Sequence, residues 1–195
     1  RFDPEKLIRR LNPLAFGIDL HWMPHAHGAI EVARLAKRHH PYTPVIFGGF
    51  SASYFHEELV RRPEVDFVIR GDSTEEPLAQ LMGLIRASKL DDESLACVPN
   101  LTWTDSAGQV RVNPITYSPP DLDHVIIDYT YVVRAVARYR DLANFVPFKD
   151  WLTYPITAAL TVRGCTHNCR TCGGSVSAFR RIHNRYRPAF RSPAQ

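Results

Sequence analysis

The chain has 195 residues, of which 45% are hydrophobic, and this is enough to bury the core of one large domain or two small ones. The formal net charge of +4 is modest, and the arginines near the end come without interleaved aromatic residues, so no nucleic-acid partner is expected. No run of about 18 apolar residues occurs, so no membrane span is expected either.

The first half of the chain alternates between strand and helix patterns. Three short apolar runs are typical of buried strands: residues 14–20, 45–47 and 66–70. Helical periodicity covers three further segments: residues 29–36, 52–62 and about 75–85. Ser51 is the expected cap of the second helix, and Asp72 or Ser73 that of the third. This order predicts an α/β fold, a Rossmann-like parallel sheet with helices on both faces.

The ends of the three predicted strands carry glycine or polar residues: Leu20-His21, Gly48-Gly49 and Gly71-Asp72. Ligands in open α/β sheets bind outside the carboxyl ends of the strands. Glycines at these positions let the backbone approach a ligand closely, and they also suit tight turns. The pattern alone leaves both interpretations open.

The second half changes character. Residues 100–104 and 110–113 flank Asp105-Ser-Ala-Gly108 and predict a β-hairpin, which a proline-containing linker follows. A helix is expected over residues 131–143. A buried strand is expected over residues 156–162, and it leads directly into Arg163-Gly164-Cys165. The cysteine loop is therefore expected at the carboxyl end of a strand, which is where α/β folds have their active sites.

Three of the four cysteines, Cys165, Cys169 and Cys172, have the spacing Cys-x3-Cys-x2-Cys, whereas Cys97 is isolated. Such a cluster indicates metal ligands rather than a disulfide framework, and a reducing cytoplasm is the expected location. Three thiolates can bind three irons of a four-iron cluster and leave the fourth iron open, whereas electron carriers supply four cysteines. The alternative from another class is a zinc-binding structural module that adds His167 or His183 as a ligand.

The cysteine spacing resembles the cluster loop of radical S-adenosylmethionine (SAM) enzymes, although Thr171 stands where an aromatic residue is frequent. The resemblance implies that Cys165, Cys169 and Cys172 hold a [4Fe-4S] cluster. In that family the amino and carboxylate groups of SAM chelate the open iron, and the reduced cluster cleaves SAM to begin radical chemistry. A reductant such as flavodoxin or ferredoxin and a small-molecule or peptide substrate are therefore the expected partners.

The strand–helix–strand order that ends at Gly48-Gly49, with residues 66–78 (DFVIRGDSTEEPL) after it, is similar to the cobalamin-binding domain of B12-type radical SAM enzymes. The resemblance implies cobalamin as a second cofactor, with methyl transfer as one reaction. It also implies four cofactor-binding residues: Gly48, Gly49, Ser51 and Gly71. The alternative is a radical SAM enzyme whose cobalamin domain is vestigial. Asp19-Leu-His21 matches the start of the axial-histidine motif, but Pro24 replaces its glycine, so we interpret His21 as a loop residue.

The resemblance divides the chain into three parts. Residues 1–95 are expected to form the cobalamin-binding-like Rossmann domain without its N-terminal part, and residues 96–150 the hairpin and linker. Residues 151–195 are expected to begin the radical SAM (β/α) barrel and to lack its C-terminal part. The chain is thus expected to be a fragment, and its sequence indicates no catalytic residue and no particular substrate.

Overall fold

The computed structural model describes residues 3–125, 128, 130–140, 150, 153, 161–184 and 187–193. Its contacts divide the chain into two compact units. The first unit comprises residues 1–119 together with 164–187, and the second comprises residues 120–163 together with 188–195. The cysteine loop therefore belongs to the same unit as the predicted Rossmann domain. The three predicted domain boundaries stay predictions.

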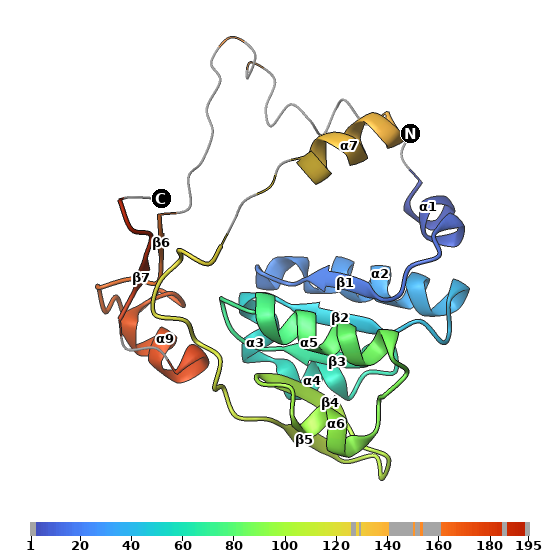
Figure 1. Ribbon diagram of the computed structural model, residues 1–195, viewed down its shortest axis with the longest axis horizontal. Helices are drawn as coiled ribbons and strands as arrows, with labels where there is room; N and C mark the ends of the chain where they lie inside the picture. The colour runs from blue at the N-terminus through green and yellow to red at the C-terminus, as the bar shows by residue number, and fades with distance from the viewer. Residues whose placement is uncertain are drawn as a thin grey trace. The chain divides into compact units, whose positions relative to one another are not determined.

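The first unit is built on a five-stranded sheet in the order β1-β2-β3-β4-β5 (Figure 1). Its strands are β1 (Phe16–Asp19), β2 (Val45–Gly48), β3 (Phe67–Ile69), β4 (Leu101–Thr104) and β5 (Val110–Val112). β1 pairs in parallel with β2, and β2 in parallel with β3, as predicted. β4 pairs antiparallel with both β3 and β5, so the sheet is mixed.

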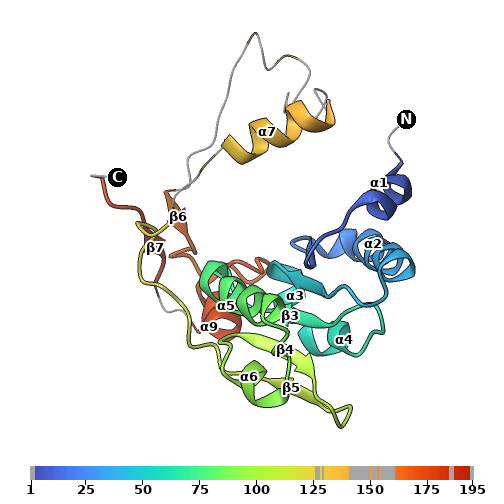
Figure 2. The same ribbon diagram turned by 45° about the vertical axis from the view of Figure 1, so that its right-hand side comes forward.

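Side chains alternate between the two faces of the sheet because successive residues of a strand point in opposite directions. Val45, Phe47 and Val68 pack against α2 (Ala26–His39), α3 (Phe50–Tyr54) and α4 (His56–Val60). Ile46 and Phe67 lie in the opposite cluster, with α5 (Glu75–Arg86) and α6 (Asp92–Ala96). Figure 2 shows α5 and α6 together on one side of the sheet. Both faces are covered, which explains the almost uninterrupted apolar runs of the central strands.

The helix predicted over residues 52–62 is in fact two short helices, α3 and α4, which are separated at Phe55. The cap predicted at Ser51 is wrong because α3 begins at Phe50 with Gly49 as its N-cap, so Ser51 lies in the first turn. Thr74 caps α5, and neither Asp72 nor Ser73 does. Three short helices of this unit were not predicted: α1 (Pro4–Arg10), the 3-10 helix η1 (Met23–His25) and α6.

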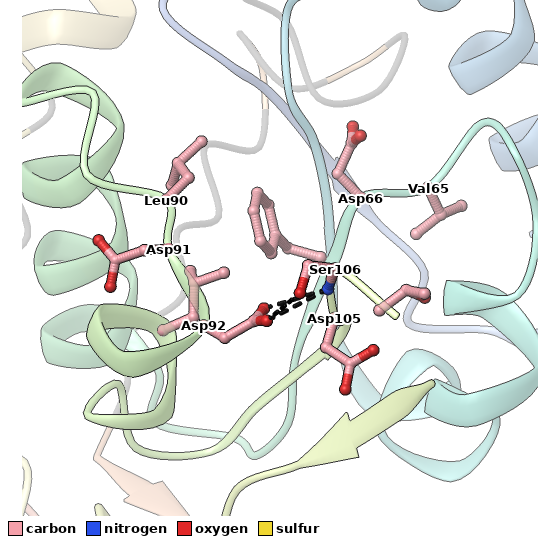
Figure 3. A pocket seen from close by; sticks show the side chains of 10 residues that line it. Val65, Asp66, Leu90, Asp91, Asp92, Asp105 and Ser106 are labelled. Atoms are coloured by element: carbon pink, nitrogen blue, oxygen red, sulfur yellow. Dashed lines mark hydrogen bonds between the residues drawn. The ribbon is translucent and has the colours of Figure 1, made fainter. Parts of the chain in front are cut away.

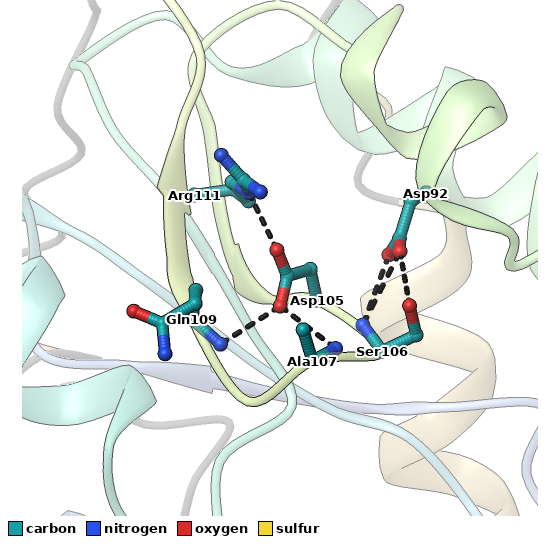
Figure 4. Close-up of polar contacts among 6 residues, drawn as sticks. All are labelled: Asp92, Asp105, Ser106, Ala107, Gln109 and Arg111. Atoms are coloured by element: carbon teal, nitrogen blue, oxygen red, sulfur yellow. Dashed lines mark hydrogen bonds and ion pairs between the residues drawn. The ribbon is translucent and has the colours of Figure 1, made fainter.

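The predicted hairpin forms, and Asp105 holds its turn (Figure 4). The Asp105 carboxylate accepts hydrogen bonds from the Ala107 and Gln109 backbone N–H groups at 3.0 and 2.8 Å, and from Arg111 Nε at 2.6 Å. The bond from Gln109 is the main reason that the pKa of Asp105 is lowered. The sequence pattern suggested a linker segment, whereas β4 bonds to β3 and extends the Rossmann-like sheet.

The second unit contains α7 (Thr130–Tyr139), β6 (Val162–Arg163) and β7 (Ala189–Phe190), and β6 pairs antiparallel with β7. Most of the strand predicted over residues 156–162 lies outside the described residues, as do residues 141–143 of the predicted helix. The barrel therefore stays a prediction. In the part of the chain that the structure describes, no helix is long and apolar enough to cross a bilayer.

Candidate cofactor site at the carboxyl edge of the sheet

The three parallel strands end at one edge of the sheet, where His21, Gly49 and Gly71 begin the connecting loops. Backbone bonds tie these loop starts together. The Leu20 N–H donates to the Gly48 carbonyl at 2.8 Å, and the Ser51 N–H donates to the His21 carbonyl at 3.3 Å. This edge is where an open α/β sheet binds its ligand.

Gly49 occupies a turn that no larger residue fits. Its φ of 99° lies in the region that disfavours side chains. A Cβ added to Gly49 would overlap the Asp19 carboxylate and lie 2.9 Å from the carbonyl carbon and oxygen of Leu20. At Gly48 the nearest atom to such a Cβ is 3.9 Å away, at the Ile69 carbonyl. The tight-turn interpretation therefore accounts for Gly49 by itself, whether or not a ligand lies nearby.

Ser53 links two of the loops and was not identified from the sequence. Its hydroxyl donates to the Gly49 carbonyl and accepts from the Gly71 N–H, both at 2.9 Å. The Ser51 hydroxyl donates to the His21 carbonyl at 2.9 Å, so Ser51 also holds the edge together. Periodicity gives no signal for such bonds because the partners lie on different strands. The structure thus brings Gly49, Ser51 and Gly71 to one edge, and their cofactor-binding role stays a prediction.

Asp72 carries the polar atom that best marks this edge as a binding site. It follows Gly71, whose φ of 122° turns the chain sharply after β3. The Asp72 Oδ2 atom is buried and has no hydrogen-bond partner among the described residues. A buried acceptor without a donor is costly, by about 1–3 kcal/mol, so a ligand N–H at this point would be favoured. From the sequence, Asp72 was singled out by its place beside a strand-end glycine and as a candidate helix cap, and the cap prediction is wrong.

The cysteine loop runs from Cys165 to Cys172 and leads into α9 (Val176–His183), which was not predicted. None of the three thiols is in a disulfide, and Cys169 and Cys172 are exposed. The Val176 N–H donates to the His167 carbonyl at 3.0 Å and so ties the loop to α9. Among the described residues, no three His, Cys, Asp or Glu side chains converge on a point that could hold a metal ion. Ligation by the three cysteines stays a prediction.

α9 and the loop contact α3 at the carboxyl edge. The Tyr54 hydroxyl donates to the Gly173 carbonyl at 3.5 Å. The ring of Phe50 lies 6.2 Å from that of Phe179 and 5.6 Å from that of His183, measured between centroids. These contacts join two segments more than 100 residues apart. The residue after the third cysteine is thereby held beside the helix that follows Gly48-Gly49.

A cleft of about 490 Å³ lies at the opposite, amino edge of the sheet (Figure 3). Four aspartates line it, but their carboxylates point in different directions: Asp66, Asp91, Asp92 and Asp105. Each has a protein partner. Asp92, for example, accepts from the Ser106 hydroxyl at 2.6 Å, and Asp66 pairs with Lys37 at 2.6 Å. These aspartates serve the fold, and the carboxyl edge remains the candidate site.

Comparisons with known proteins show what the fold of this chain is similar to. The family model described as B12 binding domain matches residues 2–81, whereas no curated protein sequence matches the chain. Two structures of the radical SAM methyltransferase TsrM from Kitasatospora setae are similar to this chain. One has tryptophan substrate and a SAM analogue bound, with 16% identity, a TM-score of 0.65, and coverage of 98% of this chain and 34% of that one. The other has cobalamin and a [4Fe-4S] cluster bound, with 17% identity, a TM-score of 0.66, and coverage of 98% and 36%.

A third structure, the cobalamin-dependent radical SAM enzyme OxsB with aqua-cobalamin and SAM bound, has 18% identity and a TM-score of 0.58. The match covers 86% of this chain and 21% of OxsB. The chain thus spans about a third of TsrM and a fifth of OxsB. Residues 2–81 match the B12 binding domain, and the chain has the fold of part of the cobalamin-dependent radical SAM enzymes.

Proposed function

We propose that this chain is part of a cobalamin-dependent radical SAM enzyme. In this proposal cobalamin binds at the carboxyl edge of the sheet, and Cys165, Cys169 and Cys172 hold a [4Fe-4S] cluster whose open iron takes SAM. Methyl transfer is the proposed reaction class, since TsrM is named a methyltransferase. The proposed substrate is a small molecule or a peptide, and the proposed electron donor is a flavodoxin-like or ferredoxin-like protein.

One observation carries the proposal. The Cys-x3-Cys-x2-Cys loop and the B12-type sheet lie in one compact unit, and Gly173, directly after the loop, contacts α3 just beyond Gly48-Gly49. An enzyme that combines a corrinoid with SAM needs its two cofactor sites close together, because the reacting groups must meet. A separate zinc-binding module has no such need for contact with the carboxyl edge.

The residues at the edge fit cobalamin. The corrin ring carries primary amides at its periphery, and an amide N–H could donate to the buried Oδ2 atom of Asp72, which lacks a protein partner among the described residues. The backbone at Gly48 is open enough for close approach, since the nearest described atom to a Cβ there is the Ile69 carbonyl oxygen at 3.9 Å. Ser51 already donates its hydroxyl proton to His21, so it could only accept from the cofactor.

The donor set of the loop fits an iron–sulfur cluster with an open iron, because three thiolates leave one iron without a protein ligand. When bound there, the cluster and SAM would supply the radical chemistry. The chain's own contribution includes a hydrogen bond from the His167 N–H to Cys165 Sγ at 3.3 Å. Such bonds to sulfur stabilise the reduced cluster and raise its potential.

The test is anaerobic reconstitution of the chain with iron and sulfide, followed by titration with hydroxocobalamin. We expect a four-iron EPR signal in the reduced protein that shifts when SAM is added, and saturable cobalamin binding in the same sample. Cys169→Ser should abolish the cluster, whereas the matched control Cys97→Ser should not, because Cys97 lies near α6 and is far along the chain from the loop. Tight zinc binding without a cluster would refute the radical SAM assignment.

Asp72→Asn provides a second variant for the cobalamin site. An amide at this position keeps the size of the side chain but presents an N–H as well as an oxygen. If Oδ2 accepts from the cofactor as a carboxylate, the variant should bind hydroxocobalamin about tenfold more weakly, since bonds to a charged acceptor are the stronger ones. If wild-type chain and Asp72→Asn bind hydroxocobalamin with the same dissociation constant, Asp72 does not contact the cofactor.

A further inference from the structure

Phe50 stands at the centre of a group of rings that we call the aromatic cluster. Its members are His21, Phe50, Tyr54, Phe179 and His183. The centroid of Phe50 lies 5.9, 5.5, 6.2 and 5.6 Å from those of the other four, in that order. Phe179 and His183 are 4.8 Å apart on α9. These distances lie in the range in which aromatic side chains attract each other.

The cluster reaches the cysteine loop on one side. A Cβ added to Gly173 would lie 3.1 Å from Cε1 of Phe50, so this glycine, directly after Cys172, packs closely on the Phe50 ring. A Cβ added to Gly174 would lie 3.8 Å from both Cys172 Sγ and the Phe179 ring. The position of the third cysteine is therefore coupled to the position of Phe50.

The same cluster reaches the carboxyl edge on the other side. Phe50 follows Gly49 directly and starts the helix that Gly49 caps. His183 is 1% exposed, and its Nδ1 lies 4.0 Å from where a Gly71 Cβ would be. His21 follows β1. The aromatic cluster thus touches the loop that follows each of the three parallel strands, which are the loops to which the proposed function assigns cobalamin.

We infer that Phe50 is a positioning residue that couples the two cofactor sites, so that the [4Fe-4S] cluster and cobalamin each strengthen the binding of the other. This inference rests on the proposed function. Phe50 begins α3 directly after Gly49, and Gly173, next to Cys172, packs on its ring. A cobalamin held at the carboxyl edge would fix this ring, and the fixed ring would hold the third cysteine in place. By linkage, a loop closed around the cluster strengthens cobalamin binding by the same factor. Couplings of this kind amount to about 5–150-fold in affinity.

The experiment measures the dissociation constant of hydroxocobalamin for the 195-residue chain before and after anaerobic cluster reconstitution. We expect wild-type protein with the cluster to bind cobalamin about tenfold more tightly. Phe50→Ala should reduce this ratio to below about twofold, and Phe50→Leu should retain part of it. Tyr42→Ala is the matched control, because Tyr42 is 96% exposed and lies outside the aromatic cluster, and it should keep the full ratio.

The ratio separates coupling from general damage. A variant that merely loosens the fold weakens cobalamin binding with and without the cluster, and so leaves the ratio unchanged. If Phe50→Ala does not fold, Phe179→Leu tests the same contact from α9. Wild-type protein that binds both cofactors with a ratio of one would overturn the inference and leave the proposed function intact. A chain that binds neither cofactor would overturn both.

Discussion

Gly49→Ala should lower the free energy of unfolding of the cofactor-free chain by several kcal/mol. At a φ of 99° a side chain costs about 1–2 kcal/mol in backbone strain. The added methyl group would also press on the Asp19 carboxylate and lie 2.9 Å from the Leu20 carbonyl, and overpacking of this kind costs about 1–3 kcal/mol. The sum of about 2–5 kcal/mol is a large share of the free energy of unfolding of a typical domain, which is about 5–15 kcal/mol.

Urea unfolding followed by circular dichroism measures this loss. Gly83→Ala is the matched control, because Gly83 lies exposed within α5 and a Cβ there meets no atom of the described residues within 4 Å. The control should raise the free energy of unfolding by up to about 1 kcal/mol, since alanine is the better helix former. A free energy of unfolding for Gly49→Ala within about 0.5 kcal/mol of wild type would refute the reasoning. Because the turn itself needs Gly49, weak cobalamin binding by a Gly49 variant would not identify a ligand contact.

Three other predictions concern the stability of the fold. Burial lowers the pKa of His56 below 6.5, so the unfolded chain binds more protons just below that pH, and stability should fall as the pH drops through this window. His56→Asn should flatten this dependence in urea midpoints measured between pH 5 and 8, roughly the range in which histidine titrates. The hydrogen bond from the Ser106 hydroxyl lowers the pKa of Asp92, so the ionised Asp92 carboxylate stabilises the folded chain. This stabilisation is fully present above about pH 4 and is lost as the pH falls through the lowered pKa. Asp92→Asn should therefore show a shallower loss of stability on acidification than wild type, and an equally steep loss would contradict this assignment. Asn113 Nδ2 donates to two carbonyl oxygens at the end of α6, at 2.9 and 2.7 Å, and Asn113→Ala should lower the unfolding free energy by about 2–4 kcal/mol in the same urea assay.

The central sheet was predictable because its signals are local. Buried parallel strands are short apolar runs. β1 and β3 each lie within a predicted run, and β2 extends one residue beyond its run, to Gly48. The hairpin was predictable for the same reason, since its turn depends on Asp105 and the residues immediately after it. Its place in the sheet was not, because pairing between β4 and β3 depends on a partner more than 30 residues away.

The start of α3 shows how a turn overrides a capping pattern. Ser51 has the residue type of an N-cap, yet its hydroxyl donates to the His21 carbonyl on the neighbouring loop. Gly49 adopts a conformation that brings the chain into a helix two residues earlier, and Phe55 then interrupts it with a φ of −109° and a ψ of 31°. Neither the bond to His21 nor the break at Phe55 can be deduced from helical periodicity.

The candidate site was predicted in part. Strand order located Gly48, Gly49 and Gly71 at one edge, because the carboxyl ends of parallel strands meet there. The linking role of Ser53 and the aromatic contacts of Phe50 depend on residues that are far apart in sequence, so no local pattern indicates them. The cysteine spacing remains the specific evidence for a cluster, and the contact between its loop and α3 is what the structure adds.

The most direct test of the central claim is the cofactor stoichiometry of a single purified sample. The chain should be reconstituted anaerobically with iron, sulfide and hydroxocobalamin, passed through a gel-filtration column, and analysed for iron, zinc and corrinoid. The proposed function predicts about four irons and about one corrinoid per wild-type chain, with the iron lost in Cys169→Ser. A wild-type chain that elutes with iron but no corrinoid, or with zinc in place of iron, would contradict it.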